Sequence, residues 1–404
     1  MRVFFVNAVC GTGSTGRIIT DLCDILKQQG HQVKVAYGIG KASRIDPADT
    51  VKISNRADYY LHNATARLTD RAGFYSHLAA KKLIRAIKDF QPDLIHLHNL
   101  HGFYVNIRML FHFLAEADIP VVWTLHDCWA MTGHCAYFSF AGCEKWKMGC
   151  GHCPQLSAYP ESWGVDQSKR NYRDKKALFT SVKNMTIVTP SRWLAEIVRQ
   201  SYLGCYPVQA IPNGIDLGVF RPTLGDVRET YGIGGKKLVL SVANVWSERK
   251  GFKDMCRLSE LLDPAGYQVV MVGLTEDQLT QVPERILPIL RTSSVEELVQ
   301  LYSAADVFVN PTYEDTYPTV NIEALACGTP VVTYNTGGSP EILDDTCGMV
   351  VEQGNVEGLA AAVKAESAVD VQYRNKCVIR AKNNNKGSCY SQYIAFYRHI
   401  IGSN

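Results

Sequence analysis

Short apolar runs alternate with helical patterns along almost the whole chain, and this alternation is what most limits the folds open to it. In the first half, the apolar runs with strand character are Val3–Val6, Gln32–Ala36, Leu94–Leu97, Val121–Leu125 and Thr186–Thr189. The gaps carry amphipathic helical patterns at Ile18–Gln29, Leu78–Asp89, Val105–Ala115 and Arg192–Gln200. Strands joined by helices pair in parallel, so this half is predicted to form an α/β domain.

A cluster of chain-breaking residues separates this half from a second one of the same kind. Residues 211–216 read Ile-Pro-Asn-Gly-Ile-Asp, and Phe220-Arg221-Pro222 lies just beyond them. The strand-like runs that follow are Lys237–Val242, Gln268–Val272, Val307–Asn310, Val331–Tyr334 and Met349–Val351. Two domains are also the natural expectation for 404 residues. We predict domains over residues 1–206 and 207–387, followed by a terminal helix over 388–404.

Two carboxylates eight residues apart, Asp315 and Glu323, follow one strand of the second domain. The strand ends at Asn310 and runs into a short loop that carries Asp315. Pro318 suits the first turn of a helix, because its missing N–H costs little there. Glu323 then lies about one turn inside that helix. Ligands of α/β sheets bind at the carboxyl ends of strands, and a helix start favours a phosphate.

The stretch from Asn310 to Leu343 resembles the E-x7-E signature of the retaining, nucleotide-sugar-dependent glycosyltransferases of family four. Asp315 stands where the first Glu of the signature usually is, and Glu323 matches the second. The resemblance runs over nearly the whole chain and is closest to enzymes of capsule and colanic-acid biosynthesis. It implies the GT-B architecture, in which two Rossmann-like domains face each other across a cleft. It also implies that the terminal helix packs back on the first domain; the alternative is an ordinary terminal amphipathic helix.

The resemblance implies a donor site in the second domain. Asp315 would hold the transferred sugar, and Glu323 would hold the ribose hydroxyls. Lys250, in the turn after the first strand of this domain, would bind the diphosphate, with Arg249 as a second cation. The alternative for both cations is a solvated turn. The backbone amides expected to bind the same phosphates belong to Tyr317, Thr319 and Val320.

A glycine-rich turn, Cys10–Arg17, follows the first strand and opens a helix. Glycines allow a ligand to approach the backbone closely. The second strand does not end in Asp or Glu, which disfavours an NAD enzyme. By the resemblance, Gly13 and Ser14 line the site near the donor diphosphate.

His126 follows the strand Val121–Leu125, at a position where family members have a histidine that contacts the transferred sugar. The alternative is a histidine satisfied in the core. We therefore assign His126, with Asp315 and Glu323, to the catalytic set. The residues expected to shape the acceptor or sugar pocket are Asp127, Trp129, Thr132 and Gly133.

Four of the thirteen cysteines fall in one turn-rich segment: Cys135, Cys143, Cys150 and Cys153. Four thiolates within reach of one centre are typical of structural zinc, and a metal would order a loop that has little core of its own. His134 and His152 are alternative ligands. The other interpretations are reduced, metal-free thiols or disulfides. No cofactor is expected for catalysis.

The chain has a net charge of +3, which is too small to indicate a nucleic-acid partner. Met1–Val6 is interpreted as a first strand rather than a signal peptide, and no apolar run approaches the roughly 18 residues that span a bilayer. A cytoplasmic protein is therefore expected. The segment Arg56–Phe90 interleaves basic and apolar side chains, which favours peripheral contact with the inner membrane face; the alternative is a solvated helical surface.

The family resemblance, with which these features agree, implies a retaining glycosyltransferase acting on a bacterial surface polysaccharide. Its donor would be a UDP- or GDP-linked sugar, and its acceptor an oligosaccharide on a polyprenyl diphosphate carrier. The alternatives are an epimerase or phosphorylase on the same fold, or a non-catalytic sugar-binding subunit, because a fold does not fix a function.

Overall fold

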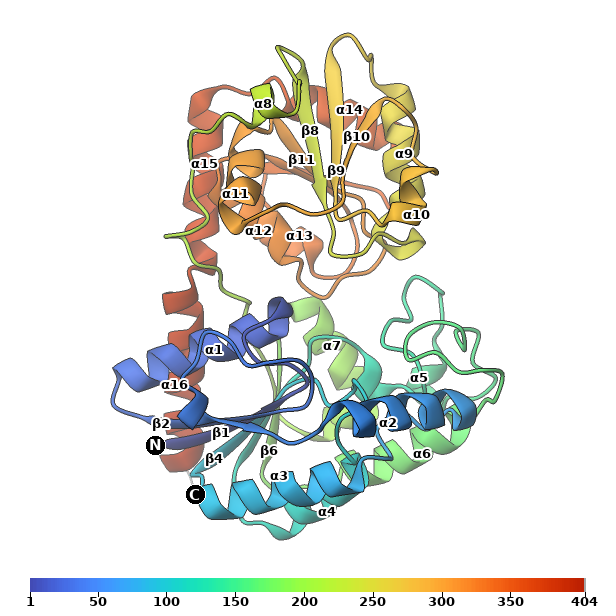
Figure 1. Cartoon of the computed structure of the whole chain (residues 1–404), viewed down its shortest axis with the longest axis vertical. Coiled ribbons are helices and arrows are strands. Elements are labelled where there is room, and N and C mark those ends of the chain that lie inside the picture. Colours follow the sequence, from blue (N-terminus) through green and yellow to red (C-terminus); the bar gives the residue numbers. More distant parts are fainter. Residues whose placement is uncertain (403–404) are drawn as a thin grey trace. The chain divides into compact units, whose positions relative to one another are not determined.

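The computed structural model describes residues 1–402 and divides the chain into two compact units (Figure 1). The first unit contains residues 1–212 together with the segment from Tyr390 onwards, and the second contains Asn213–Cys389. The boundary between the units lies six residues later than the predicted 206/207. The reason is the short strand β7 (Val208–Ala210), which pairs with the first sheet.

The first unit is built on a parallel sheet of seven strands in the order β3-β2-β1-β4-β5-β6-β7. Its strands, besides β7, are β1 (Arg2–Asn7), β2 (Gln32–Tyr37), β3 (Thr50–Lys52), β4 (Leu94–Leu97), β5 (Val121–Thr124) and β6 (Met185–Thr189). Its helices are α1 (Gly13–Gln28), α2 (Arg56–Thr69), α3 (His77–Phe90), α4 (Ile107–Glu116), α5 (Lys145–Met148), α6 (Ser168–Phe179) and α7 (Arg192–Gln200). The strand order reverses between β1 and β4, which makes their carboxyl ends the expected ligand position.

The second unit is built on a parallel sheet of six strands in the order β10-β9-β8-β11-β12-β13. The strands are β8 (Lys237–Val242), β9 (Tyr267–Val272), β10 (Ile286–Ile289), β11 (Val307–Asn310), β12 (Val331–Tyr334) and β13 (Gly348–Val351). The helices are α8 (Val227–Thr230), α9 (Phe252–Leu261), α10 (Glu276–Leu279), α11 (Val295–Ala304), α12 (Thr319–Ala326), α13 (Ser339–Ile342), α14 (Val356–Glu366) and α15 (Val371–Ala381). Here the order reverses between β8 and β11.

Helix α16 (Lys386–Gly402) continues from the second unit into the first. Tyr393 and Tyr397 are almost fully buried in the first unit. The Tyr393 hydroxyl lies 3.2 Å from Thr124 Oγ1, and the Tyr397 hydroxyl lies 2.6 Å from His96 Nδ1. This helix therefore contributes both apolar surface and hydrogen bonds to the interior of the first unit. None of the helices within residues 1–402 is both long and apolar enough to cross a membrane.

Candidate functional site

An ion pair lies at the switch point of the second sheet. Lys250 ends the short 3-10 helix Glu248–Lys250 after β8, and Asp315 lies in the loop after β11. Lys250 Nζ is 2.5 Å from Asp315 Oδ2, and the two side chains are 23% and 21% exposed. The structure thus brings together two predicted site residues that are 65 positions apart in the chain.

The environment of Asp315 favours its ionised form. Burial opposes the charge, but the charge and hydrogen bond of Lys250, with Arg249 nearby, outweigh it and lower the pKa of Asp315 below 3.8. The Tyr317 amide donates to Asp315 Oδ1 at 3.2 Å. In this structure the carboxylate therefore occupies the Tyr317 amide that we expected to bind a phosphate.

Backbone contacts hold the two loops against each other. Arg249 Nη1 donates to the carbonyl of Glu314 at 2.6 Å, and the Tyr313 amide donates to the carbonyl of Arg249 at 2.8 Å. Gly251 has a φ of +76°, and a Cβ there would lie 2.2 Å from the carbonyl oxygen of Pro311. Only glycine satisfies both conditions, so Gly251 allows the Lys250 turn to approach the Asp315 loop.

Helix α12 begins at Thr319: Pro318, which was expected in the first turn, is the N-cap, with extended backbone angles. Thr319 and Val320 occupy the first turn, where amides have no acceptor within the helix. Glu323 lies about one turn further in and is 9% exposed. Its Oε2 accepts a hydrogen bond from Tyr302 of α11 at 3.1 Å. Tyr302 thus fixes the orientation of the second signature carboxylate.

Three histidines form a row at the carboxyl ends of β4 and β5 in the first unit. The ring centroids of His96 and His98 are 4.1 Å apart, and those of His98 and His126 are 5.3 Å apart with nearly parallel planes. His98 Nδ1 lies 2.9 Å from His126 Nε2. Burial lowers the pKa of His96 and His98 well below the ordinary value and that of His126 to about 4, the last despite the opposing charge of Asp127. All three rings are neutral at physiological pH.

Asp127 belongs to a second cluster in the same unit. His101 Nε2 lies 2.6 Å from Asp127 Oδ2, and the Trp129 amide donates to Asp127 Oδ1 at 2.9 Å. Burial raises the pKa of Asp127, but the charge and hydrogen bond of His101 outweigh this and lower it. Asp127 and Trp129 are therefore held in one cluster with His101, which was not among the predicted residues; the role of the first two in an acceptor or sugar pocket stays a prediction.

Thr132 and Gly133 are buried, as Asp127 and Trp129 are, and their role in the acceptor or sugar pocket stays a prediction. Lys175 of α6 is also buried: Nζ donates to the carbonyls of Trp129 and Thr132 at 2.9 and 3.2 Å and lies 3.5 Å from the Trp129 ring centroid. Burial lowers the pKa of Lys175 to about 7. These contacts indicate that Thr132 supports the site, because its carbonyl oxygen is bonded to Lys175.

The glycine-rich turn lies at the switch point of the first sheet, directly after β1. Gly13 is the first residue of α1 and has a φ of +64°, and Ser14 follows it; both are exposed. A Cβ on Gly11 would lie 1.9 Å from the carbonyl oxygen of Ser43, so the turn also depends on a close backbone approach. The position of Gly13 and Ser14 at a strand end is the one that the sequence predicted.

The four cysteines of the turn-rich segment line one small cavity of about 20 Å³. Cys153 and Cys135 share a hydrogen bond that lowers the pKa of Cys153, and Cys150 Sγ accepts from the Gly133 amide at 3.2 Å. Within residues 1–402, however, no three His, Cys, Asp or Glu side chains are placed to hold one metal ion. The structural zinc site of Cys135, Cys143, Cys150 and Cys153 stays a prediction.

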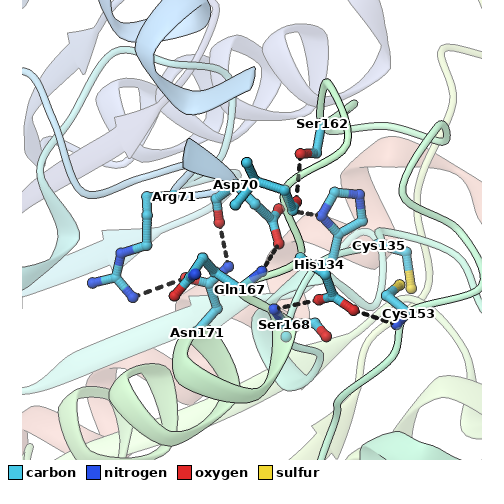
Figure 2. A network of polar contacts seen from close by, with 12 residues as sticks. Asp70, Arg71, His134, Cys135, Cys153, Ser162, Gln167, Ser168 and Asn171 are labelled. Atoms are coloured by element: carbon cyan, nitrogen blue, oxygen red, sulfur yellow. Dashed lines mark hydrogen bonds and ion pairs between the residues drawn. The ribbon is translucent and has the colours of Figure 1, made fainter. Parts of the chain in front are cut away.

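A buried polar network holds this segment to α2 and α6 instead (Figure 2). His134 Nδ1 lies 2.5 Å from Asp70 Oδ1, and the Gln167 amide donates to Asp70 Oδ2 at 2.8 Å. Burial opposes the charge of His134, but the hydrogen bond and charge of Asp70 outweigh it and raise its pKa. His134 is therefore engaged as an ion-pair partner, and His152, the other alternative ligand, is exposed.

Four supporting residues were not predicted: His98, His101, Lys175 and Tyr302. The pattern His96-Leu97-His98-Asn99, which spans the carboxyl end of the apolar strand β4, was a usable signal for His98. Lys175 and Tyr302 lie on helices far from the motifs in sequence, so no local pattern indicates them.

Comparison with known proteins identifies the family. Residues 15–219 match the family model described as Glycosyltransferase Family 4, and residues 236–365 match Glycosyl transferases group 1. The chain is 26% identical over 399 residues to a putative colanic acid biosynthesis glycosyl transferase, WcaC of Escherichia coli (strain K12), with 91% of each chain covered. It is also 27% identical over 263 residues to D-inositol 3-phosphate glycosyltransferase of Mycobacteroides abscessus, which covers 60% of this chain and 54% of that one.

Solved structures show the same fold over complete chains. Sucrose-phosphate synthase from Thermosynechococcus elongatus matches with a TM-score of 0.72 at 16% identity, covering 100% of both chains. Anabaena HepE in complex with UDP-glucose matches with a TM-score of 0.66 at 15% identity, again covering 100% of both. These neighbours share the GT-B fold of two Rossmann-like domains, which confirms the predicted fold class. Since one family model spans more than half of the sequence, the chain is a glycosyltransferase and belongs to glycosyltransferase family 4.

Proposed function

We propose that this enzyme is a retaining glycosyltransferase that moves a sugar from a nucleoside diphosphate to a hydroxyl group of a growing, lipid-linked bacterial surface polysaccharide. The observation that carries the proposal is the Lys250–Asp315 pair at the switch point of the second sheet, beside the first turn of α12. A diphosphate needs a cation and helix amides, and a sugar needs a hydrogen-bond acceptor for its hydroxyls. This position offers all of them.

These contacts support the following roles. Lys250, supported by Arg249 and the amides of Thr319 and Val320, binds the diphosphate. Because Asp315 is 2.5 Å from Lys250, a donor held by its phosphates has its sugar end beside Asp315. Glu323, oriented by Tyr302, accepts hydrogen bonds from the ribose.

The chemical step is a front-face displacement. The bond between the anomeric carbon and the phosphate oxygen breaks, a bond to the acceptor oxygen forms on the same face, and the leaving phosphate takes the acceptor's proton. Lys250 and the α12 amides stabilise the charge that develops on the leaving oxygen, so catalysis consists mainly of positioning and electrostatics.

A thermal-shift panel of nucleoside diphosphate sugars tests the donor assignment. The relatives solved with UDP and UDP-glucose put uridine donors first in the panel, followed by guanosine donors. A ligand at a hundred times its Kd adds about 2.7 kcal/mol to the stability of the folded state. Lys250→Ala should abolish the shift, and Lys253→Ala is the matched control, because its side chain is 75% exposed and pairs with Glu248. Equal shifts in both variants, or none with any donor, would refute the proposal.

The lipid-linked acceptor is supported by the surface of the first unit. The large apolar side chains exposed there all fall within residues 60–78 or 140–165: Tyr60, Leu61, Leu68, Leu78, Phe140, Met148, Tyr159, Trp163 and Val165. The Trp163 amide donates to the carbonyl of Arg67 at 2.8 Å, so the second segment adjoins α2. Apolar side chains next to basic ones suit an anionic bilayer. The colanic-acid relative gives the proposal its polysaccharide class.

A further inference from the structure

The histidine row in the first unit contains a hydrogen bond whose direction can be worked out. His98 Nδ1 and His126 Nε2 are 2.9 Å apart, and burial keeps both rings neutral. A neutral imidazole carries one N–H, so one of the two nitrogens donates and the other accepts. The question is which of the two carries the proton.

The environment of the other ring nitrogen of His98, Nε2, decides between the two possibilities. His98 Nε2 is buried and has no hydrogen-bond partner within residues 1–402. The neighbouring His96 cannot serve, because its Nε2 lies 2.7 Å from Thr124 Oγ1 and its Nδ1 lies 2.6 Å from the Tyr397 hydroxyl. On the remaining sides, His98 faces the Phe5 ring at 6.2 Å and the stacked ring of His126.

A buried N–H without an acceptor is rarer and costlier than a buried lone pair without a donor. If His126 donated, the proton of His98 would have to be on Nε2, in this apolar position. If His98 donates from Nδ1, its Nε2 carries only a lone pair. The second arrangement is the favourable one.

We infer that His98 is a positioning residue, which donates from Nδ1 to His126 Nε2 and thereby holds His126 as its Nδ1–H tautomer. His126 then carries its proton at Nδ1, and its Nε2 accepts from His98. In this tautomer the ring can act toward a sugar hydroxyl only as a donor, which excludes His126 as the general base. The meaning of this donor for catalysis rests on the proposed function, but the tautomer itself does not.

Nuclear magnetic resonance measures the tautomer directly. Two-bond ¹H–¹⁵N correlations of the histidine-labelled, full-length protein near neutral pH distinguish protonated from unprotonated ring nitrogens. We expect His126 and His98 both to be protonated at Nδ1 only. The signals that disappear in the His126→Gln variant are assigned to His126. A His126 protonated at Nε2 would overturn the inference. This readout needs no substrate, so it stands even if the donor panel refutes the proposed function.

Two variants test the consequence for turnover with whichever donor the panel selects. Asn at position 98 keeps an N–H near Nδ1, whereas Asp offers only acceptors and forces the proton of His126 onto Nε2. His98→Asp should lower kcat roughly tenfold more than His98→Asn, with donor KM little changed. His112→Asn, on the exposed side of α4, is the control. Equal kcat values in the two folded variants would contradict the positioning role.

Discussion

The two sheets use the same position, the carboxyl ends of their central strands, for opposite kinds of side chain. In the second unit this position holds the charged, partly exposed pair Lys250 and Asp315. In the first unit it holds His98 and His126, which burial keeps neutral. A partly exposed charge can exchange one partner for another, whereas a buried ring keeps the orientation that packing gives it. We therefore expect affinity to reside in the second unit and orientation in the first.

The largest expected effect is on the thermal stability of the first unit. The test decides whether a metal ion or packing alone orders the cysteine-containing segment of this unit. If zinc binds Cys135, Cys143, Cys150 and Cys153, a chelator should lower Tm on the order of 10 °C, because structural zinc supplies folding free energy. Cys150→Ser should do the same, and Cys205→Ser, at an exposed position, should not. Elemental analysis should find about one zinc per chain. A well-folded, metal-free protein would leave packing and the Asp70–His134 network as the explanation.

The second test concerns charge in the second unit. Glu323→Gln should raise the donor Kd about ten- to a hundredfold, because hydrogen bonds to a charged group contribute roughly 1.5–3 kcal/mol. Tyr302→Phe keeps the ring but removes the hydroxyl that orients Glu323, so a smaller loss is expected. Isothermal titration of both variants with the selected donor measures this. An unchanged Kd in folded Glu323→Gln would remove the ribose assignment.

The third test asks whether the first unit also contributes a membrane surface. Leu61 and Leu68 are seven residues apart on α2 and are 70% and 57% exposed. Changing both to Ser should lower the fraction that sediments with anionic vesicles roughly fivefold, because apolar insertion is lost. Leu224→Ser, at an exposed position of the second unit, is the control. Wild-type protein that stays in the supernatant at low salt would exclude the membrane contact.

The smallest expected effect is the pH dependence of the ion pair. The pKa of Asp315 is lower in the folded state than its ordinary 3.8, so its contribution to stability is fully present above about pH 4. It is lost as the pH falls through the lowered pKa. Chemical unfolding of wild type and Asp315→Asn between about pH 5 and pH 2 should show the two stabilities converging in acid. A difference in unfolding free energy between the two proteins that stays constant over this pH range would indicate that the ion pair with Lys250 does not lower the pKa of Asp315.

The interior of both sheets could be predicted from sequence because the central strands are predominantly apolar and lie between helical patterns. The strands that were missed are β3, β7 and β10, and each lies at a sheet edge. β3 and β7 are only three residues long and each contain at least one polar residue, so they give no apolar run, and Pro288 within β10 argues against a strand there. Missing β7 is also what moved the predicted domain boundary.

The residues of the candidate site also fall into a group that the sequence predicts and a group that it does not. Lys250, Asp315 and Glu323 could be predicted because each belongs to a local motif next to a strand end. The partners that set their geometry, such as Tyr302, and those of the first unit, such as His101 and Lys175, depend on contacts between distant segments. No spacing in the sequence encodes the 2.9 Å contact between His98 and His126.

The place of α16 has a consequence for biosynthesis. Its residues from Tyr390 onwards complete the interior of the first unit, yet the ribosome makes them only after the whole second unit. At roughly 5–20 residues per second, the nascent first unit waits on the order of ten to thirty-five seconds with the surface that Tyr393 and Tyr397 later cover still open. During that interval His96 lacks the Tyr397 hydroxyl. The first domain to be synthesised is thus the last to be finished.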